Sequence, residues 1–276
     1  MSNKYSLFQN LKYAYNNKKN KKINKGNNCD NMFYYLDIQL DNNKQEKFCS
    51  MIKHNFQKLG VVDYNSEMAG YRQVYFLKHC LTITKKKFFN DSFADVTITE
   101  TNAGLGGFTY LLLFNFNKLN VIDIDEKRIN FIKSNINNVY SEFHNIKNKE
   151  INFYSDDCSK VIKNITSDII ISDFPWGGVD YKKSNTIRLL IQDSDGNDLY
   201  IDDMVVNLYK QNKFKIYLVY IPKNFDLKTF NEIMNKNDIK YDVLEKEKLF
   251  KDFLNIRLFE NFKERFILIY NPNYSK

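Results

Sequence analysis

Residues that build covalent or metal-bound scaffolds are scarce in this sequence: its 276 residues include four cysteines and three histidines. No two cysteines have the Cys-x-x-Cys spacing, so the sequence predicts neither a disulfide framework nor a zinc site, and we expect no metal. Long apolar runs are missing as well, since none approaches the roughly 18 residues that cross a bilayer. The N-terminus carries no hydrophobic signal core. We therefore expect no membrane partner and a cytoplasmic protein, with a viral factory or the nucleus as alternatives.

Proline, tryptophan and glycine are also rare, which makes their clustering informative. The chain has three prolines, one tryptophan and nine glycines. The tryptophan, one proline and two of the glycines fall within residues 172–178, SDFPWGG, directly after the apolar run at 169–171. A rigid aromatic loop at the end of a strand is either ordinary turn chemistry or part of an active site, and its surroundings must decide between the two.

Basic residues outnumber acidic ones, 41 to 33, which leaves a net charge of +8. This favours a polyanionic partner such as nucleic acid, although AT-rich coding produces a similar composition. Residues 1–28 are basic, rich in asparagine and poor in aliphatic side chains, so they cannot offset their own ordering entropy. We expect them to form a flexible basic arm, which either contacts phosphates or is a solvated tail.

Helical spacing of apolar residues characterises residues 29–90, which we expect to form a helical N-terminal extension with stretches at 41–60, 66–81 and 84–90. From residue 91 to 276, short β-rich segments alternate with helical ones, which predicts an α/β domain with a mostly parallel sheet. The last two strands are expected to form an antiparallel closing pair. The predicted strands cover 95–99, 120–124, 151–154, 167–172, 213–221, 239–247 and 265–270, and the predicted helices cover 107–116, 126–140, 158–164 and 201–211.

A glycine-rich turn, TETNAGLGGFT, follows the first predicted strand. Its glycines let the backbone turn tightly and approach a ligand, and the free N–H groups of the helix that begins near Gly107 face the same place. A bare helix start can look the same. If the turn binds a cofactor, the candidate residues are Glu100, Asn102, Ala103, Gly104, Gly106 and Gly107.

Acidic residues stand at the ends of the next two predicted strands. Asp123 follows the turn by about 20 residues, where a carboxylate binds the ribose diol of a nucleotide. Asp125 is expected to cap the following helix. Asp156 and Asp157 offer acceptors for an adenine amino group, with helix capping as the alternative role. The turn lacks the G-x-G-x-x-G spacing of nicotinamide sites and leads on to an aromatic proline loop, which suits S-adenosylmethionine.

The order and spacing of ITETNAGLGGFT, VIDIDEKRINFIKSNINNVY, INFYSDDC and IIISDFPWGGVDY resemble those of the class I S-adenosylmethionine-dependent methyltransferases, and most closely the trimethylguanosine synthases. The similarity extends over residues 84–270. It implies a Rossmann-like α/β fold with a mostly parallel seven-stranded sheet, and S-adenosylmethionine as cofactor. It also implies methyl transfer to the exocyclic N2 of 7-methylguanosine in RNA caps, which yields di- or trimethylguanosine, and therefore capped RNA as the partner.

In that resemblance, the loop after the fourth strand is catalytic. Asp173 and the backbone carbonyl of Phe174 take the positions that accept the protons of the amine, and Pro175 sets the direction of the loop. Trp176 offers a face to the base, and the positive charge of 7-methylguanine adds about 0.5 to 2 kcal/mol to such a stack. The alternative is that Trp176 anchors the core and that Asp173 is a cap.

Basic and amide side chains near this loop are the candidates for binding the cap. They are Lys182, Arg188, Lys223 and Asn224, of which the last two lie in IPKNFD, a segment that also resembles the family. Arg72 and Lys85 to Lys87 could reach over the same strand ends. Residues 181–202 are expected to form a hairpin that serves as a wall of the acceptor site. Its DSDGND turn lacks the spacing of a calcium-binding loop.

Two departures from the family pattern leave other functions open. Asp173 and Phe174 stand where the family has serine and proline, which shifts the loop toward those of enzymes that methylate adenine N6 or other exocyclic amines. The alternatives are an exocyclic-amine methyltransferase on adenine N6 or on internal guanine N2 of RNA or DNA, and a non-catalytic RNA-binding subunit with this fold. The sequence does not determine whether one or two methyl groups are added, nor the oligomeric state.

Overall fold

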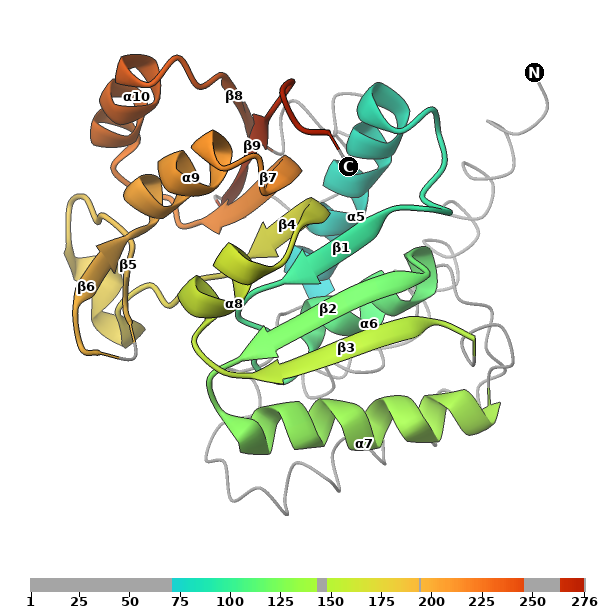
Figure 1. The fold of residues 1–276 in the computed structure, drawn as a ribbon. Coiled ribbons are helices and arrows are strands. Elements are labelled where there is room, and N and C mark those ends of the chain that lie inside the picture. The colour runs from blue at the N-terminus through green and yellow to red at the C-terminus, as the bar shows by residue number, and fades with distance from the viewer. Residues whose placement is uncertain (1–70, 143–147, 194, 246–263, 276) are drawn as a thin grey trace, which may run out of the picture.

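A seven-stranded sheet forms the centre of the computed structural model, which describes residues 71–142, 148–193, 195–245 and 264–275 (Figure 1). The strand order is β3-β2-β1-β4-β7-β9-β8, and every strand is parallel to its neighbours except β9, which is antiparallel to both of its own. This confirms the predicted mostly parallel sheet with an antiparallel closing pair. The strands are β1 (Thr97–Glu100), β2 (Lys118–Asp123), β3 (Glu150–Ser155), β4 (Ser167–Ser172), β7 (Phe214–Ile221), β8 (Tyr241–Leu244) and β9 (Arg265–Tyr270).

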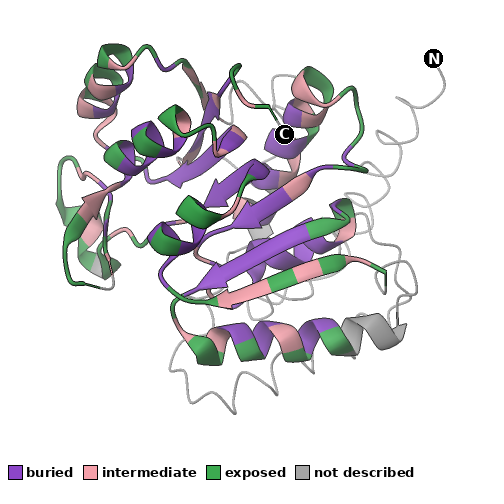
Figure 2. Cartoon of the chain, in the orientation of Figure 1, coloured by how far each residue is buried: buried purple, intermediate pink, exposed green. Residues whose placement is uncertain are grey.

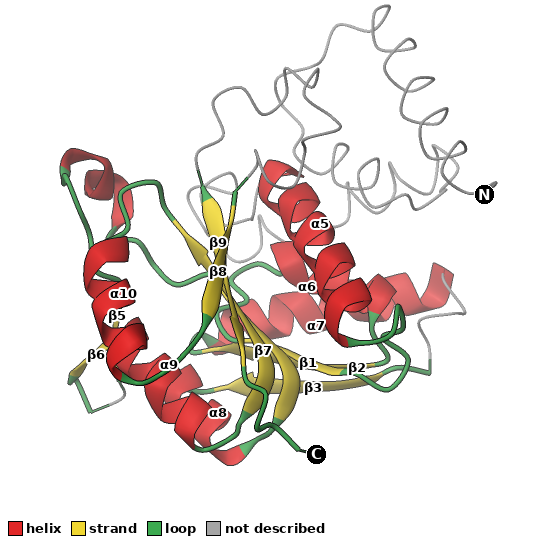
Figure 3. Cartoon of the chain, turned by 90° about the horizontal axis from the view of Figure 1, so that it is seen from above, coloured by secondary structure: helices red, strands yellow, loops and turns green. Residues whose placement is uncertain are grey.

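Helices cover both faces of this sheet, as the view from above shows (Figure 3). One hydrophobic cluster lies between the sheet and α5, α6 and α7, and a second lies between the sheet and α8, α9 and α10. The central strands are buried and the outer helix surfaces exposed (Figure 2), as a doubly covered parallel sheet requires. The helices are α5 (Tyr71–Phe88), α6 (Gly107–Asn115), α7 (Glu126–Glu142), α8 (Cys158–Asn164), α9 (Ile201–Lys210) and α10 (Leu227–Lys236).

Two helices differ from the prediction. Residues 71–88, which span the described part of the stretches expected at 66–81 and 84–90, form one continuous helix, α5. In it the hydroxyls of Thr82 and Thr84 donate to the carbonyls of Lys78 and Cys80. Helix α10 was not predicted, although Phe230 and Met234 have the spacing of a buried helix face. Asp226 caps its first turn by accepting from the backbone N–H of Thr229 at 3.1 Å.

Much of the N-terminal part cannot be compared with its prediction, because residues 1–70 lie outside the described residues. The basic arm at 1–28 and the helical stretch at 41–60 therefore stay predictions. Within the described part of the chain, no helix is both long and apolar enough to span a membrane.

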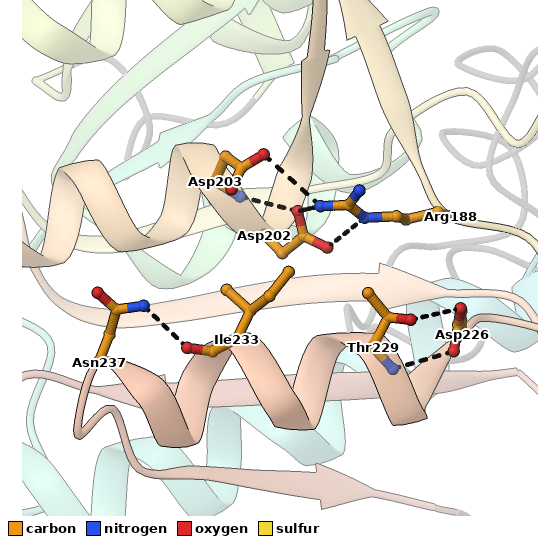
Figure 4. Close-up of polar contacts among 7 residues, drawn as sticks. All are labelled: Arg188, Asp202, Asp203, Asp226, Thr229, Ile233 and Asn237. Carbon is orange, nitrogen blue, oxygen red and sulfur yellow. Dashed lines mark hydrogen bonds and ion pairs between the residues drawn. The ribbon is translucent and has the colours of Figure 1, made fainter.

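The predicted hairpin is present as an insert between β4 and α9, formed by β5 (Leu190–Gln192) and β6 (Asp198–Tyr200). Arg188, just before β5, donates from Nε and from an Nη to the two oxygens of the buried Asp202, both at 2.8 Å (Figure 4). Its guanidinium also lies 3.8 Å from the ring centroid of Tyr200. This ion pair ties the beginning of the hairpin to the first turn of α9.

We expect Asp202→Asn to destabilise the protein by about 1 to 3 kcal/mol, because the buried amide cannot accept from both guanidinium donors. Urea unfolding at pH 7 measures this, with the exposed neighbour Asp203→Asn as the matched control. Equal losses in the two variants would contradict a stabilising role specific to the buried pair.

Candidate active site

Three carboxyl groups come together where the parallel strands end. Glu100 ends β1, Asp123 ends β2, and Asp173 follows β4. Asp173 and Asp123 both lie near enough to raise the pKa of Glu100 through charge repulsion. The strand ends predicted to meet therefore carry a cluster of carboxyl groups that repel one another when ionised, and such clusters are common at functional sites.

Glu100 is the most deeply buried of the three. Burial raises the pKa of its carboxyl to about 8, although the hydroxyl of Thr109 on α6 donates to it at 2.6 Å. Near neutral pH this carboxyl is therefore mostly protonated, and a bound cation would favour its charged form.

The glycine-rich turn has the tight geometry that the sequence predicts. Gly104 and Gly106 have positive φ angles of 54° and 87°. A Cβ on Gly106 would lie 3.1 Å from the side chain of Ile132 and 3.2 Å from that of Tyr110, so the position has no room for a side chain. Helix α6 begins directly after it, at Gly107. The N–H groups of this helix start thus face the carboxyl edge of the sheet.

Asp123 links this turn to β2. Its carboxylate accepts from the backbone N–H of Gly104 at 2.8 Å and from that of Asp125 at 2.9 Å, with Arg128 at 3.9 Å. Burial raises its pKa. A ribose diol would therefore donate to a carboxylate that two backbone N–H groups already hold in place. Asp125 accepts from the N–H of Lys127, as its predicted capping role requires.

Asp156 and Asp157 have different environments. Asp157 is buried and caps α8 by accepting from the N–H of Ser159 at 2.8 Å. Asp156 is exposed at the carboxyl end of β3. Of the two, Asp156 is the one placed to meet an adenine amino group.

Ile124 is a candidate site residue that the sequence analysis missed. Its side chain is 66% exposed between Asp123 and Asp125, which is unusual for a large apolar residue. It offers an apolar surface beside the expected ribose position, where a purine ring could lie. The signal in the sequence is an isoleucine between two aspartates after a buried strand.

Buried side chains anchor the loop that follows β4, which the sequence analysis expected to be catalytic. The Phe174 ring is buried in the cluster under α8 and α9, so an apolar anchor stands where the family has proline. At the end of β4, the hydroxyl of Ser172 lies 2.7 Å from that of Thr101 and 2.8 Å from that of Tyr217. Pro175 is exposed at the surface of the loop. These contacts hold the backbone that carries Asp173.

Asp173 itself has no such support. Among the described residues, no hydrogen bond or ion pair reaches its half-buried carboxylate, and burial alone raises its pKa to about 7. Since a desolvated carboxylate without donors is unfavourable, this group is suited to a ligand that supplies them.

Trp176 is half-buried rather than free. Its ring centroid lies 5.2 Å from those of Tyr181 and Tyr220, and it packs against both hydrophobic clusters. Tyr220 on β7 comes from a distant part of the sequence, so this packing could not be seen in the residues next to Trp176. The indole Nε1–H is buried without an acceptor among the described residues.

Some of the candidate cap-binding residues already make hydrogen bonds within the protein, and others are exposed. Lys182 and Lys223 are exposed. The side-chain amide of Asn224 donates at 2.8 Å to the carbonyls of Tyr181 and Ser184 and so holds the turn that follows Trp176. Arg188 faces Asp202, and a phosphate would have to compete with that carboxylate.

Lys85 to Lys87 do not reach this edge. Lys215, at the amino end of β7, donates to the carbonyl of Phe88 at 2.8 Å, and Lys87 lies 3.4 Å from Asp242. Lys85 to Lys87 therefore lie at the amino edge of the sheet, and their predicted reach over the carboxyl ends was wrong. The side chain of Arg72 lies outside the described residues.

A family model described as RNA cap guanine-N2 methyltransferase matches residues 96–259, more than half of the chain. An uncharacterized protein of Acanthamoeba polyphaga mimivirus is 26% identical over 152 residues, so the match spans 54% of this chain and 55%, about half, of that relative.

Two solved structures that align with this chain are described as methyltransferases. A methyltransferase from Geobacter sulfurreducens aligns with a TM-score of 0.46 and 11% identity, over 86% of this chain and 93% of its own. The T. thermophilus 16S rRNA N2 methyltransferase, solved with AdoMet and guanosine, aligns with a TM-score of 0.45 and 9% identity, over 77% of this chain and 44% of its own.

Proposed function

The chain belongs to the RNA cap guanine-N2 methyltransferase family, and from this premise we propose that it methylates the exocyclic N2 of 7-methylguanosine in RNA caps. One observation carries the proposal furthest. The loop that follows β4 presents the Asp173 carboxylate, which has no donor among the described residues, within the acidic cluster and three residues before Trp176.

The residues at the carboxyl edge fit the cofactor, S-adenosylmethionine, which supplies an electrophilic methyl group on a sulfonium and is converted to neutral-sulfur S-adenosylhomocysteine. The cluster of Glu100, Asp123 and Asp173 favours a cationic ligand. Asp123 is placed for the ribose diol, Ile124 for the adenine face and Asp156 for the adenine amino group.

The residues of the acceptor side act mainly by positioning. The N2 lone pair of guanine is delocalised into the ring, so the amine is a weak nucleophile. Asp173 accepts an N2–H hydrogen bond, which turns the lone pair toward the methyl group. As the N–C bond forms and the S–C bond breaks, N2 loses a proton, and the Asp173 carboxylate is placed to take it. Orientation in a desolvated site supplies most of the rate under this scheme.

A second candidate acceptor is adenine N6, because an aspartate in place of the family's serine is typical of loops that bind that amine. The test is methyl transfer from labelled S-adenosylmethionine to m7GpppA, GpppA and uncapped RNA, followed by analysis of the product nucleosides. We expect N2-methylated 7-methylguanosine from m7GpppA alone. Equal transfer to uncapped RNA would overturn the cap proposal, and N6-methyladenosine would establish the second candidate.

We expect Asp123→Ala to weaken binding of S-adenosylmethionine by about 10- to 100-fold. The substitution removes the carboxylate that would accept from the ribose diol and that accepts from the Gly104 N–H. Ile124→Ala should weaken it less, by the loss of apolar contact with the adenine face. Calorimetric titration measures both affinities, and Lys127→Ala, in the first turn of α7, is the control. Unchanged affinity in Asp123→Ala would contradict the ribose assignment.

Trp176→Ala should weaken binding of a cap analogue by about 1 to 3 kcal/mol, the usual cost of losing a base-stacking ring. The affinity for S-adenosylmethionine should stay the same. Because the ring also packs on Tyr220, this variant will lose stability as well. Trp176→Phe keeps most of that packing and separates the two effects. An equal loss of affinity for both ligands in Trp176→Phe would contradict the stacking role.

A further inference from the structure

We propose that three hydroxyl groups, those of Tyr217, Ser172 and Thr101, form a directed chain of hydrogen bonds that positions the side chain of Asn102 for S-adenosylmethionine. The inference assigns positioning residues that lie outside the acidic cluster, and it goes beyond the proposed function. It concerns the cofactor and does not depend on which base accepts the methyl group.

The chain of hydroxyls crosses the carboxyl edge of the sheet from β7 to the glycine-rich turn. The Tyr217 hydroxyl on β7 lies 2.8 Å from that of Ser172, the last residue of β4. The Ser172 hydroxyl lies 2.7 Å from that of Thr101, which directly follows β1. The Thr101 hydroxyl in turn donates to Oδ1 of Asn102 at 2.8 Å. Since β1, β4 and β7 are neighbours in the sheet, each hydroxyl reaches the next across one pair of strands.

Each hydroxyl has one proton to donate, and this sets the direction of the chain. Thr101 gives its proton to the amide oxygen of Asn102, which can only accept. Thr101 must therefore accept from Ser172, and Ser172 must accept from Tyr217. Burial raises the pKa of Tyr217, so the first donor keeps its proton. With its oxygen held by Thr101, the Asn102 side chain can offer only its NH2 group to other partners.

The NH2 group of Asn102 meets the start of α8, beside the expected ribose position. Burial raises the pKa of the Cys158 thiol, and the hydrogen bond from the Asn102 side chain opposes this effect. The charge of Asp123 also acts on that thiol, so Asn102 and Cys158 lie near the carboxylate assigned to the ribose. An amide has two N–H donors, and the one that is not directed at Cys158 is suited to an oxygen of the cofactor.

The alternative is that the three hydroxyl-bearing residues only fill the core. Tyr217, Ser172 and Thr101 are fully buried, and apolar side chains of similar shape would pack there without the cost of desolvating a hydroxyl. Their polar atoms satisfy one another, and the chain ends at the partly exposed Asn102 in the turn. A fully connected polar network fixes one arrangement of its members. The place where this network ends therefore indicates a role at the cofactor turn in addition to packing.

A second buried network supplies a matched control. Thr99 lies two residues before Thr101, and its hydroxyl is also fully buried, where it bonds to the hydroxyl of Ser167 and accepts from the amide of Asn120. This network is further from the carboxyl edge, because Ser167 begins β4 whereas Ser172 ends it. Thr99→Val and Thr101→Val thus remove the same group from neighbouring parts of the core, and only Thr101→Val cuts the chain to the turn.

The test measures the affinity of the full chain for S-adenosylhomocysteine by calorimetric titration, which involves no turnover. We expect Asn102→Ala to weaken binding by about 10-fold, Thr101→Val by about 3- to 10-fold, and Tyr217→Phe, which removes the first donor, by about 2- to 5-fold. Thr101→Ser, which keeps the hydroxyl, and the control Thr99→Val should both stay within about twofold of the wild type. Urea unfolding of each variant measures the loss of stability separately.

The double variant Thr101→Val, Asn102→Ala distinguishes positioning from a general loss of structure. If Thr101 acts through Asn102, its substitution should change the affinity by less than about twofold once the amide is absent, because coupled effects do not add. A full additional loss in the double variant, equal losses in Thr99→Val and Thr101→Val, or an unchanged affinity in Asn102→Ala overturns the inference.

A second route remains if Thr101→Val does not fold. Tyr217→Phe, alone and combined with Asn102→Ala, then decides by the same criterion. The cap proposal is judged by methyl transfer to cap analogues, so either proposal can fail without the other.

Discussion

Asp173→Ala is expected to lower the rate of methyl transfer by about 100- to 1,000-fold at saturating substrates, the cost of removing one preorganised polar group from a transition state. The reason is that the Asp173 carboxylate is the side chain placed to orient the N2 lone pair and to accept its proton. Single-turnover transfer to m7GpppA measures the rate directly. Asp180→Asn, in the following turn, should leave it unchanged.

The pH dependence of the wild type gives a second readout. A protonated Asp173 cannot accept from N2–H, and burial places its pKa at about 7. The rate should therefore rise with pH through about 7 and then level off. Because Glu100 is coupled to Asp173 by charge repulsion, the rise belongs to the pair of carboxyls. Retention of more than a third of the rate in Asp173→Ala, or a flat wild-type profile from pH 5.5 to 8.5, would contradict the assigned role.

The second large effect is a loss of stability as pH rises. Glu100 has its pKa raised from 4.5 to about 8 in the folded chain. Between these values the folded chain holds a proton that the unfolded chain has already released, so the free energy of unfolding falls as pH increases through this window. The expected loss is about 2 to 5 kcal/mol, at about 1.4 kcal/mol for each unit of pKa difference.

Glu100→Gln should flatten this dependence, because the amide does not titrate and its carbonyl can still accept from Thr109. Urea unfolding from pH 5 to pH 9 measures the two profiles, with the exposed Asp156→Asn as the control. S-adenosylmethionine should restore more stability to the wild type at pH 9 than at pH 5, since its positive charge offsets the ionised cluster. Parallel profiles for wild type and Glu100→Gln would contradict this account.

The sheet was predictable because two strong local signals agree along the chain. Apolar runs such as Ile169 to Ile171 identify the buried strands, and glycine or aspartate directly after them marks where each strand ends. Helix α10 escaped prediction although its capping aspartate, Asp226, is a local signal. The long helix α5 was divided in two because its threonines weaken the helical pattern, whereas in the structure their hydroxyls are satisfied within the helix.

By itself, the sequence determined where the parallel strands begin and end along the chain. It therefore determined which residues stand at the carboxyl edge: Glu100, Asp123, Asp156 and the loop from Asp173 to Trp176. Successive parallel strands end on the same side, so residues that follow them must meet. Only the tertiary structure decided which partners these residues have. In the structure, Trp176 packs against Tyr220 and Arg188 pairs with Asp202. Lys85 to Lys87 lie at the amino edge of the sheet, opposite the site. Whether a polar atom is satisfied depends on groups that are distant in sequence, and for that reason only the folded chain shows that the Asp173 carboxylate has no hydrogen-bond or ion-pair partner within the described part of the chain.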